Sequence, residues 1–213
     1  MQSLFITATG TNVGKTHIAL KLIDAIAQQG LKPGVYKPIE TGVTKKALDA
    51  ASLLIACQHT NPAFAKLTIA DITAYTFSLS ASPFCADTKH TINPQYLIDK
   101  HNMLLKKCDI LLIEGAGGLM VPIAKEYMMI NLIRDLKAKA LLVTPSHLGC
   151  INDTLLSMMA LHNFDINFDW CVNLYKDKEI FKEVTQPYYD AIFPNWWSAE
   201  RGLSSYLEHF LNI

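Results

Sequence analysis

The segment that decides the fold is Thr9-Gly10-Thr11-Asn12-Val13-Gly14-Lys15-Thr16. It follows a short apolar run, residues 4–8, and precedes a stretch with helical spacing from Ile18 to Ile26. A strand, a glycine-containing loop and an amphipathic helix in this order expose backbone N–H groups at a helix N-terminus, where they bind a polyphosphate. Lys15 is then placed to reach the β- and γ-phosphates, and the Thr16 hydroxyl to bind Mg²⁺. The segment therefore predicts a phosphate-binding loop.

The loop departs from the strict pattern Gly-x-x-x-x-Gly-Lys-Ser/Thr, because Thr9 stands where the first glycine belongs. A turn that merely contains Gly-Lys-Thr is the alternative. The order of strand, loop and helix favours the phosphate-binding interpretation.

Short apolar runs alternate with helical patterns along the rest of the chain. Further strands are predicted at residues 33–38, 109–113, 140–144 and 170–174. Helices are predicted over residues 48–57, 94–107, 129–136, 152–162 and 203–211. In the helix over 94–107, the side chains expected to face the core are Tyr96, Leu97, Met103 and Leu104. Because strands that alternate with helices form a parallel sheet, we predict a P-loop NTPase-like α/β fold: one domain over residues 1–213, with a mostly parallel central sheet flanked by helices.

Composition excludes several classes of protein. The 19 Lys and Arg balance the 19 Asp and Glu among 213 residues, and half of the residues are apolar. A general nucleic-acid binder needs an excess of cations, and a disordered acidic chain lacks so much apolar material. We therefore expect a compact protein with no nucleic-acid partner.

Cysteine usage and the N-terminus bear on the compartment. The five cysteines are widely spaced without a Cys-x-x-Cys pair, which favours reduced, buried thiols over disulfides or a zinc cluster. Residues 1–5 lack the basic region of a signal peptide, and no apolar run approaches the roughly 18 residues of a membrane helix. A cytoplasmic protein with no membrane partner is expected.

Two further residues follow predicted strands and fit a phosphate site. Glu114 ends the run 110–113 and precedes Gly115-Ala116-Gly117-Gly118, which suits an acidic partner for the metal. Lys37 ends the second strand, at the edge where open parallel sheets bind ligands, and supplies a second cation for a transferring phosphoryl group. A surface glutamate in a glycine turn and a solvated lysine are the alternatives.

These residues together resemble the dethiobiotin synthetase family, which uses ATP to close a ureido ring in biotin synthesis. The resemblance covers roughly residues 1–175 and rests on the loop above and on Tyr36-Lys37-Pro38-Ile39-Glu40-Thr41-Gly42, Ser82-Pro83, Glu114-Gly115-Ala116-Gly117-Gly118 and Leu148-Gly149-Cys150-Ile151-Asn152. The pieces occur in the order of the family.

The resemblance implies roles for individual residues. Lys37 and Lys15 are the implied catalytic residues, and Thr16, Asp49 and Glu114 the implied ligands of Mg²⁺. Nucleotide contacts are implied for Asn12, Val13, Gly14, Lys15, Thr16, His17, Glu114, Gly115, Ala116, Gly117 and Asn173. Substrate contacts are implied for Thr11, Lys37, Thr41, Gly149, Cys150, Ile151 and Asn152. For Asp49 the alternative is an acid in the first turn of a helix, and for residues 148–152 it is ordinary helix capping.

The implied reaction joins 7,8-diaminononanoate and CO₂ with ATP as co-substrate and Mg²⁺ as cofactor, through a carbamate and a carbamic-phosphoric anhydride. The family also implies a homodimer in which residues 149–152 of the neighbouring subunit bind the substrate carboxylate. A helix N-terminus with free N–H groups suits a carboxylate.

The chain departs from the family at three places, the first of which is Ala8 in place of a frequent glycine. Glu40 adds a negative charge that we expect near Lys37. Asn173 matches the purine-contacting asparagine, but the later Gly-x-Ile/Leu-Pro segment is present only as Ala191-Ile192-Phe193-Pro194. Weaker selectivity for the base of the nucleotide is therefore expected.

A nucleotide-switched binding protein, such as the partition and cell-division ATPases, is the alternative. Those proteins carry a second lysine in the loop, which falls at Gly10 here, and often a basic DNA surface or an amphipathic membrane tail. The predicted helix over 202–213 is apolar on one face and nearly uncharged, which favours packing. A cobalamin-type amidase-linked synthetase needs an extra domain that 213 residues do not accommodate.

Overall fold

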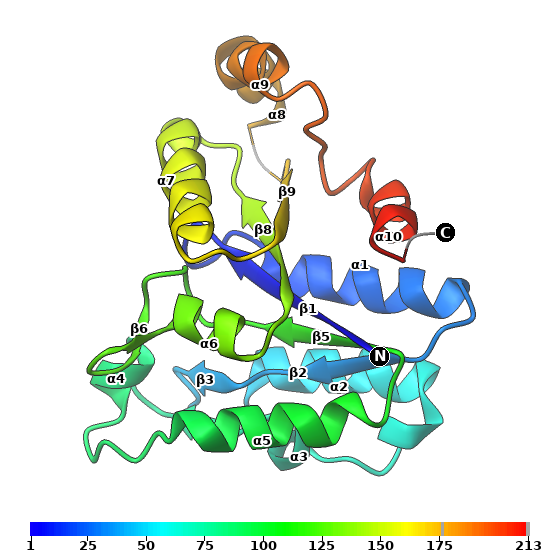
Figure 1. Ribbon diagram of the computed structural model, residues 1–213, viewed down its shortest axis with the longest axis vertical. Helices are drawn as coiled ribbons and strands as arrows, with labels where there is room; N and C mark the ends of the chain where they lie inside the picture. Colours follow the sequence, from blue (N-terminus) through cyan, green and yellow to red (C-terminus); the bar gives the residue numbers. More distant parts are fainter. Residues whose placement is uncertain (176, 212–213) are drawn as a thin grey trace.

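A five-stranded parallel sheet forms the centre of the molecule. The computed structural model describes residues 1–175 and 177–211, and the strand order across the sheet is β2-β5-β1-β8-β9 (Figure 1). In that order the strands are β2 (Pro33–Tyr36), β5 (Ile110–Glu114), β1 (Gln2–Ala8), β8 (Lys139–Thr144) and β9 (Phe168–Val172). Every neighbouring pair runs parallel, so the prediction of an α/β fold with a parallel central sheet is confirmed.

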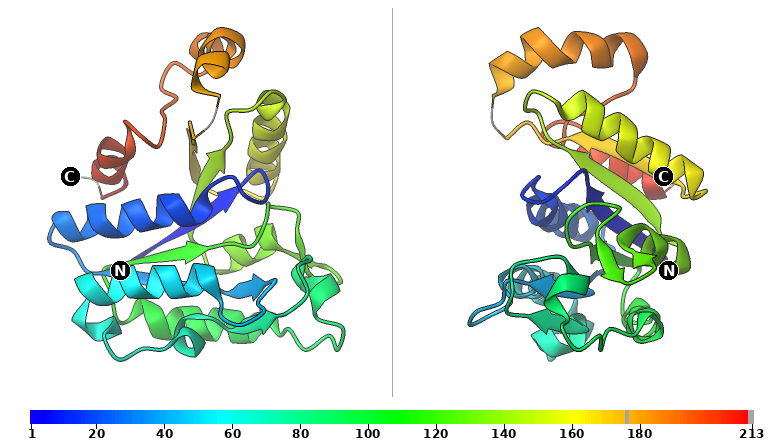
Figure 2. Two further views of the ribbon diagram at one scale, coloured as in Figure 1. Left: turned by 180° about the vertical axis from the view of Figure 1, so that it is seen from behind. Right: turned by 90° about the vertical axis from the view of Figure 1, so that its left-hand side faces the viewer.

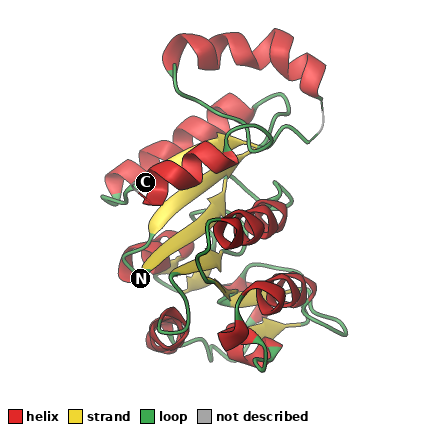
Figure 3. Ribbon diagram, turned by 90° about the vertical axis from the view of Figure 1, so that its right-hand side faces the viewer, coloured by secondary structure: helices red, strands yellow, loops and turns green. Residues whose placement is uncertain are grey.

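Helices cover both faces of the sheet, as Figures 2 and 3 show. The longer helices are α1 (Lys15–Gln28), α2 (Leu48–Thr60), α5 (Pro94–Leu105), α6 (Met129–Asp135), α7 (Cys150–Asn163) and α10 (Leu203–Leu211). Helices α1 and α2 pack against each other on one face, whereas α5 and α6 lie on the other (Figure 2). The sheet is therefore covered on both sides.

Shorter elements complete the edges. They are η1 (Pro62–Phe64), α3 (Ile69–Ile72), α4 (Pro83–Ala86), α8 (Lys178–Ile180), the π-helical turn η2 (Phe181–Thr185) and α9 (Gln186–Ile192). Two small pairs of strands accompany them: β3 (Ile39–Thr41) runs parallel to β4 (Tyr75–Phe77), and β6 (Pro122–Ala124) runs antiparallel to β7 (Tyr127–Met128). The sequence pattern predicted none of these short elements.

The core lies around β1 and β5. Residues 4–8 of β1 and all of β5 are buried, without alternation between buried and exposed positions. A strand covered by helices on both faces requires apolar residues on both, which explains the continuous apolar runs. The same covering leaves the carboxyl ends of the strands as the accessible edge for a ligand.

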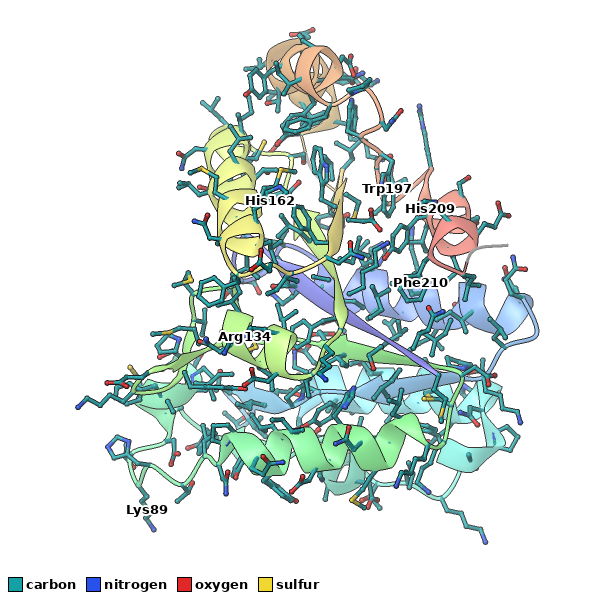
Figure 4. All side chains as sticks on the ribbon, in the orientation of Figure 1. Lys89, Arg134, His162, Trp197, His209 and Phe210 are labelled. Atoms are coloured by element: carbon teal, nitrogen blue, oxygen red, sulfur yellow. The ribbon has the colours of Figure 1, made fainter. Side chains whose placement is uncertain are left out.

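Aromatic residues of the C-terminal region pack with the main hydrophobic core. In α10, Tyr206 stacks on Trp197 with ring centroids 5.0 Å apart, and Phe210 is buried. Figure 4 labels Trp197 and Phe210. Helix α10 contacts α1, so it packs as expected, although residues 212–213 of the predicted helix lie outside the described residues. Within the described part of the chain, no helix is long and apolar enough to span a membrane.

Two local predictions were wrong. In α5, Tyr96 and Met103 are exposed, whereas Leu97, His101 and Leu104 face the core. These three positions follow the spacing i, i+4, i+7 of one helix face, and the buried His101 ring lies 2.8 Å from the Ser3 hydroxyl.

The last strand begins two residues earlier than predicted, at Phe168 rather than Trp170. It lies at the edge of the sheet, and its first three residues are only partly buried, so apolar content does not mark its bounds.

Candidate active site

The loop between β1 and α1 has the backbone shape of an anion site. Asn12 and Gly14 adopt positive φ angles of 60° and 103°. Gly14 is the residue before α1 and provides no side-chain cap, so the first N–H groups of this helix remain directed at the loop. A helix N-terminus of this kind favours a bound phosphate.

Lys15 lies over this loop. Its ammonium donates a 2.9 Å hydrogen bond to the Gly10 carbonyl oxygen, and the residue is buried. Burial, reinforced by the neighbouring Lys37 charge, lowers the pKa of Lys15 to about 8. A bound polyphosphate stabilises the ammonium form, so Lys15 is suited to hold one.

Lys37, Glu114 and Asp49 form a charged cluster beside the loop. The Lys37 Nζ atom lies 2.5 Å from Glu114 Oε1 and 3.2 Å from Asp49 Oδ2. Burial lowers the pKa of Lys37, but the two carboxylates outweigh it and raise the pKa above its ordinary value. Lys37 is therefore a buried, fully charged ammonium at the carboxyl end of β2.

The cluster leaves one acidic atom without a partner. Thr16 donates a 3.0 Å hydrogen bond from its hydroxyl to Glu114 Oε1, whereas Glu114 Oε2 is buried and has no hydrogen-bond partner. The Asp49 carboxylate is about half exposed, with 46% of its side-chain surface accessible. One hydroxyl and two carboxylates fit a cation that takes its other ligands from phosphates and water, as Mg²⁺ does. Among the described residues, no group of three or more His, Cys, Asp or Glu side chains could hold a metal by itself.

Asn173 connects the end of β9 to the phosphate loop. Its side-chain amide donates a 2.8 Å hydrogen bond to the Val13 carbonyl oxygen. A Cβ atom placed on Gly14 would lie 2.2 Å from Asn173 Nδ2, which explains the glycine at this position. Asn173 thus holds the loop from outside, a contact that the sequence pattern did not indicate.

Two cavities meet at this loop. The first has a volume of about 700 Å³, and it is lined by charged residues of the cluster and by Thr11, Asn12, Gly14, Lys15, Thr16, Ile39, Glu40, Thr41, Ser80, Ala81, Ser82, Pro83, Gly115, Ala116, Gly117 and Val121. The second has a volume of about 540 Å³ and is lined by Asn12, Val13, Gly14, His17, Pro145, Ser146, His147, Asn173, Tyr175 and Asp177. Asn12 and Gly14 border both, so a nucleotide can extend from one into the other.

Glu40 lines the same cavity as Lys37, and its carboxylate binds the backbone of α2. Its two carboxylate oxygens accept hydrogen bonds from the backbone N–H groups of Asp49 and Ala50, at 3.1 and 2.9 Å. Its charge is therefore directed at the N-terminus of α2. The sequence carried no signal for this contact, because the residues are nine and ten positions apart.

The predicted substrate residues 149–152 lie apart from the others. None of them lines either cavity of its own chain. Gly149 precedes α7 with a φ of 97°, and the buried Cys150 lies 3.8 Å from the Tyr189 hydroxyl. The remaining predicted residues all line one or both cavities.

Comparisons with known proteins give the family. A family model described as an AAA domain matches residues 2–169. The ATP-dependent dethiobiotin synthetase BioD of Sulfurovum sp. is 59% identical over 206 residues, which are 97% of this chain and 98% of that protein. The protein of the same name from Wolinella succinogenes is 38% identical over 192 residues, 89% of this chain and 88% of that one.

Solved structures are similar in fold. A plasmid partition protein from Borrelia burgdorferi has a TM-score of 0.59 at 8% identity, and the alignment covers 99% of this chain and 98% of that one. The MinC:MinD cell division protein complex of Aquifex aeolicus gives 0.57 at 16% identity, covering 98% and 86%. Identities this low show a shared fold alone.

Proposed function

The chain belongs to the ATP-dependent dethiobiotin synthetase family, whose members are ligases of biotin biosynthesis, and from this we propose that it carboxylates 7,8-diaminononanoate and closes its ring to dethiobiotin with Mg²⁺ and ATP. The observation that carries the proposal is the convergence of Lys15, Lys37 and Glu114 on one cavity at the phosphate loop. Two cations beside an anion-binding loop suit the transfer of a phosphoryl group to a small substrate in that cavity.

We assign the Mg²⁺ ligands to Thr16, Asp49 and Glu114. The partnerless Glu114 Oε2 atom supports this assignment, because a buried carboxylate oxygen without a hydrogen bond is costly unless a cation or water satisfies it. When bound, Mg²⁺ would neutralise charge on the β- and γ-phosphates. Lys37 pairs with both carboxylates, so it offsets part of their charge.

The reaction needs little acid–base chemistry from the protein. One amine of the substrate attacks CO₂ and loses a proton, which gives a carbamate. A carbamate oxygen attacks the γ-phosphorus and ADP leaves; the second amine then attacks the carbonyl carbon, loses a proton and expels phosphate. Lys15 and Lys37 hold the phosphoryl oxygens and offset the charge that develops on them. Positioning and electrostatic stabilisation therefore provide most of the acceleration of phosphoryl transfer.

A homodimer would complete the substrate site. Residues 149–152 lie outside the cavities of their own chain, which supports their assignment to the site of a neighbouring subunit. Helix α7, which they open, is fourteen residues long and presents its N–H groups after Gly149, suited to a carboxylate. The same helix exposes Leu156 and Met159, three residues apart, by 57% and 59%, which suits a subunit interface.

We assign the second cavity to the base and ribose of the nucleotide. Asn173 lines it and donates one N–H of its amide to Val13, which leaves the second N–H and the carbonyl oxygen for a base. The expected weak selectivity rests on the altered segment Ala191-Ile192-Phe193-Pro194. Similar kcat/KM values for ATP, GTP and CTP are expected, and a strong preference for ATP would refute this part of the proposal.

Release of phosphate measured with and without diamine and bicarbonate tests the function. We expect release that depends on both substrates together and a product with the mass of dethiobiotin. The control omits the diamine at saturating ATP. ATP hydrolysis without stimulation by the diamine would contradict the synthetase and favour a nucleotide-switched binding protein. Analytical ultracentrifugation tests the dimer separately.

A further inference from the structure

Glu40 lies in β3 at the wall of the first cavity, and both oxygens of its carboxylate accept hydrogen bonds from the protein backbone. The residue is buried, with 7% of its surface exposed. Its Oε1 atom accepts the N–H of Asp49 and its Oε2 atom accepts the N–H of Ala50. Both oxygens therefore bind the first turn of α2.

Helix α2 has no cap of its own. Its N-cap residue is Ala47, whose methyl group cannot accept a hydrogen bond, and the side chain forms no cap. The N–H groups of Asp49 and Ala50 occupy the second and third helical positions, the ones that an N-cap side chain normally satisfies. Glu40, which lies in the strand β3, accepts these two hydrogen bonds in place of an N-cap side chain. Its negative charge also suits the positive end of the helix.

The anchored turn carries Asp49. The Asp49 N–H is bound by Glu40, while its carboxylate lies 3.2 Å from Lys37 Nζ. The preceding residues 44–46 are exposed and Ala47 is buried, but none of them provides a side-chain cap, so the polar contact to this turn comes from Glu40. Glu40 lies only three residues after Lys37. One short segment therefore positions both Lys37 and, through Glu40, the helix turn that carries Asp49.

We propose that Glu40 is a positioning residue: its carboxylate fixes the N-terminus of α2 and thereby holds the Asp49 carboxylate at the cation site beside Lys37 and Glu114. The inference rests on the proposed Mg²⁺ role of Asp49. Loss of an outer partner of a metal ligand typically weakens the metal site ten- to a hundredfold. Direct binding of a substrate amine by Glu40 is the competing role, since the residue lines the cavity.

Binding of Mn²⁺ to the protein with a non-hydrolysable ATP analogue, followed by electron paramagnetic resonance, tests the proposal without turnover. In Glu40→Ala the dissociation constant should rise about tenfold. Glu40→Gln keeps one acceptor and should lie between the wild type and Glu40→Ala. Hydrogen exchange at the Asp49 and Ala50 amides should be faster in both variants, and circular dichroism confirms that they fold.

A rescue variant distinguishes positioning of Asp49 by Glu40 from direct binding of the substrate by Glu40. Ala47 has φ −70° and ψ 99°, an N-cap conformation, so Ala47→Ser places a hydroxyl next to the same two N–H groups. In Glu40→Ala/Ala47→Ser, Mn²⁺ affinity should return to within about threefold of the wild type. Lys45→Ala, in the exposed loop before α2, is the matched control and should bind Mn²⁺ normally.

Removal of Asp49 provides the decisive comparison. In an Asp49→Ala background, Glu40→Ala should weaken Mn²⁺ binding no further. A further tenfold loss there would overturn the inference, as would normal Mn²⁺ affinity in Glu40→Ala combined with a raised KM for the diamine. If Asp49→Ala itself leaves Mn²⁺ affinity unchanged, the proposed metal role of Asp49 fails and the inference fails with it. The synthetase function is tested separately, by diamine-dependent phosphate release.

Discussion

The phosphate-loop side of the molecule and its C-terminal region, residues 177–211, differ in what they bury. The first buries charged groups: Lys15, Lys37, Glu40 and Glu114 are all less than 10% exposed. In the C-terminal region the buried polar residues are Thr185 and Ser198, neither of them charged. Buried charges cost stability unless they are paired, and they concentrate where a protein performs chemistry.

Aromatic rings hold the C-terminal region. Tyr189 lies at its centre, 5.2 Å from Trp170, 5.9 Å from Phe181 and 6.0 Å from Trp196 between ring centroids. Such rings contribute large buried areas and favourable edge-to-face geometry. The comparison suggests a division: substitutions on the first side should affect turnover, and substitutions in the aromatic cluster should affect stability.

The largest effect is expected from Lys37→Ala. The change removes a buried cation from beside Glu114 and Asp49, and turnover should fall about a thousandfold while the ATP analogue still binds. Diamine-dependent phosphate release and calorimetric nucleotide binding measure the two quantities. Phosphoryl transfer at the wild-type rate in a single turnover would refute the role of Lys37.

Lys139→Ala is the matched control for this lysine. Lys139 also forms an ion pair, 2.6 Å from Asp169, but both side chains are partly exposed and neither lines the phosphate-loop cavities. A partly exposed pair contributes at most about 1 kcal/mol. Turnover should be unchanged, so a loss comparable to that of Lys37→Ala would contradict the proposed division.

Phe181→Ala should have the next largest effect, on stability alone. Phe181 is fully buried against Tyr189 and Trp196, and removal of a buried aromatic ring costs about 3 kcal/mol. Urea unfolding should show this loss, with kcat within about twofold of the wild type below the unfolding transition. Tyr188→Ala, which truncates an exposed neighbouring ring, should cost less than about 1 kcal/mol. A large fall in kcat for folded Phe181→Ala would show that the aromatic cluster also shapes the active site.

Gly14→Ala tests the contact between the phosphate loop and Asn173 at the end of β9. The new methyl group would collide with Asn173 at 2.2 Å, and alanine is strained at a φ of 103°. The KM for ATP should rise ten- to a hundredfold, and part of that loss should return in Gly14→Ala/Asn173→Ala. Gly30→Ala is the control, because Gly30 also has positive φ but nothing within 4 Å of the added atom. No change in KM for Gly14→Ala would show that Asn173 does not hold the loop.

The phosphate-loop side and the C-terminal region also differ in how much of their structure the sequence predicts. The phosphate loop was predictable because strand, loop and helix adjoin in the chain and carry the chemistry within eight residues, 9–16. The Asn173 contact with Val13 and the Glu40 contact with α2 join positions that only the folded chain brings together. No local period indicates such contacts.

In the C-terminal region the sequence predicted the helix over residues 203–211, which is α10, but not the elements before it. Its aromatic residues are unevenly spaced from Phe181 to Phe210, and the strand that precedes them lies at the sheet edge, where apolar content marks its bounds poorly. The π-helical turn η2 between α8 and α9 further disturbs the helical period. Buried rings from separate elements make this region stable, and tertiary packing alone defines which rings meet.

The smallest effect concerns pH. Burial, together with the Lys37 charge, lowers the pKa of Lys15 to about 8 in the nucleotide-free protein, and a bound phosphate requires the ammonium form. Affinity for an ATP analogue should therefore be nearly constant below pH 7.5 and fall about eightfold by pH 9. Over the same range the nucleotide-free protein should gain stability from this group, because the unfolded chain, with its higher pKa, binds more protons. Lys15→Arg stays charged throughout, so neither its nucleotide affinity nor its stability should change with pH through this group. A pH profile like that of the wild type would assign the titration to another group.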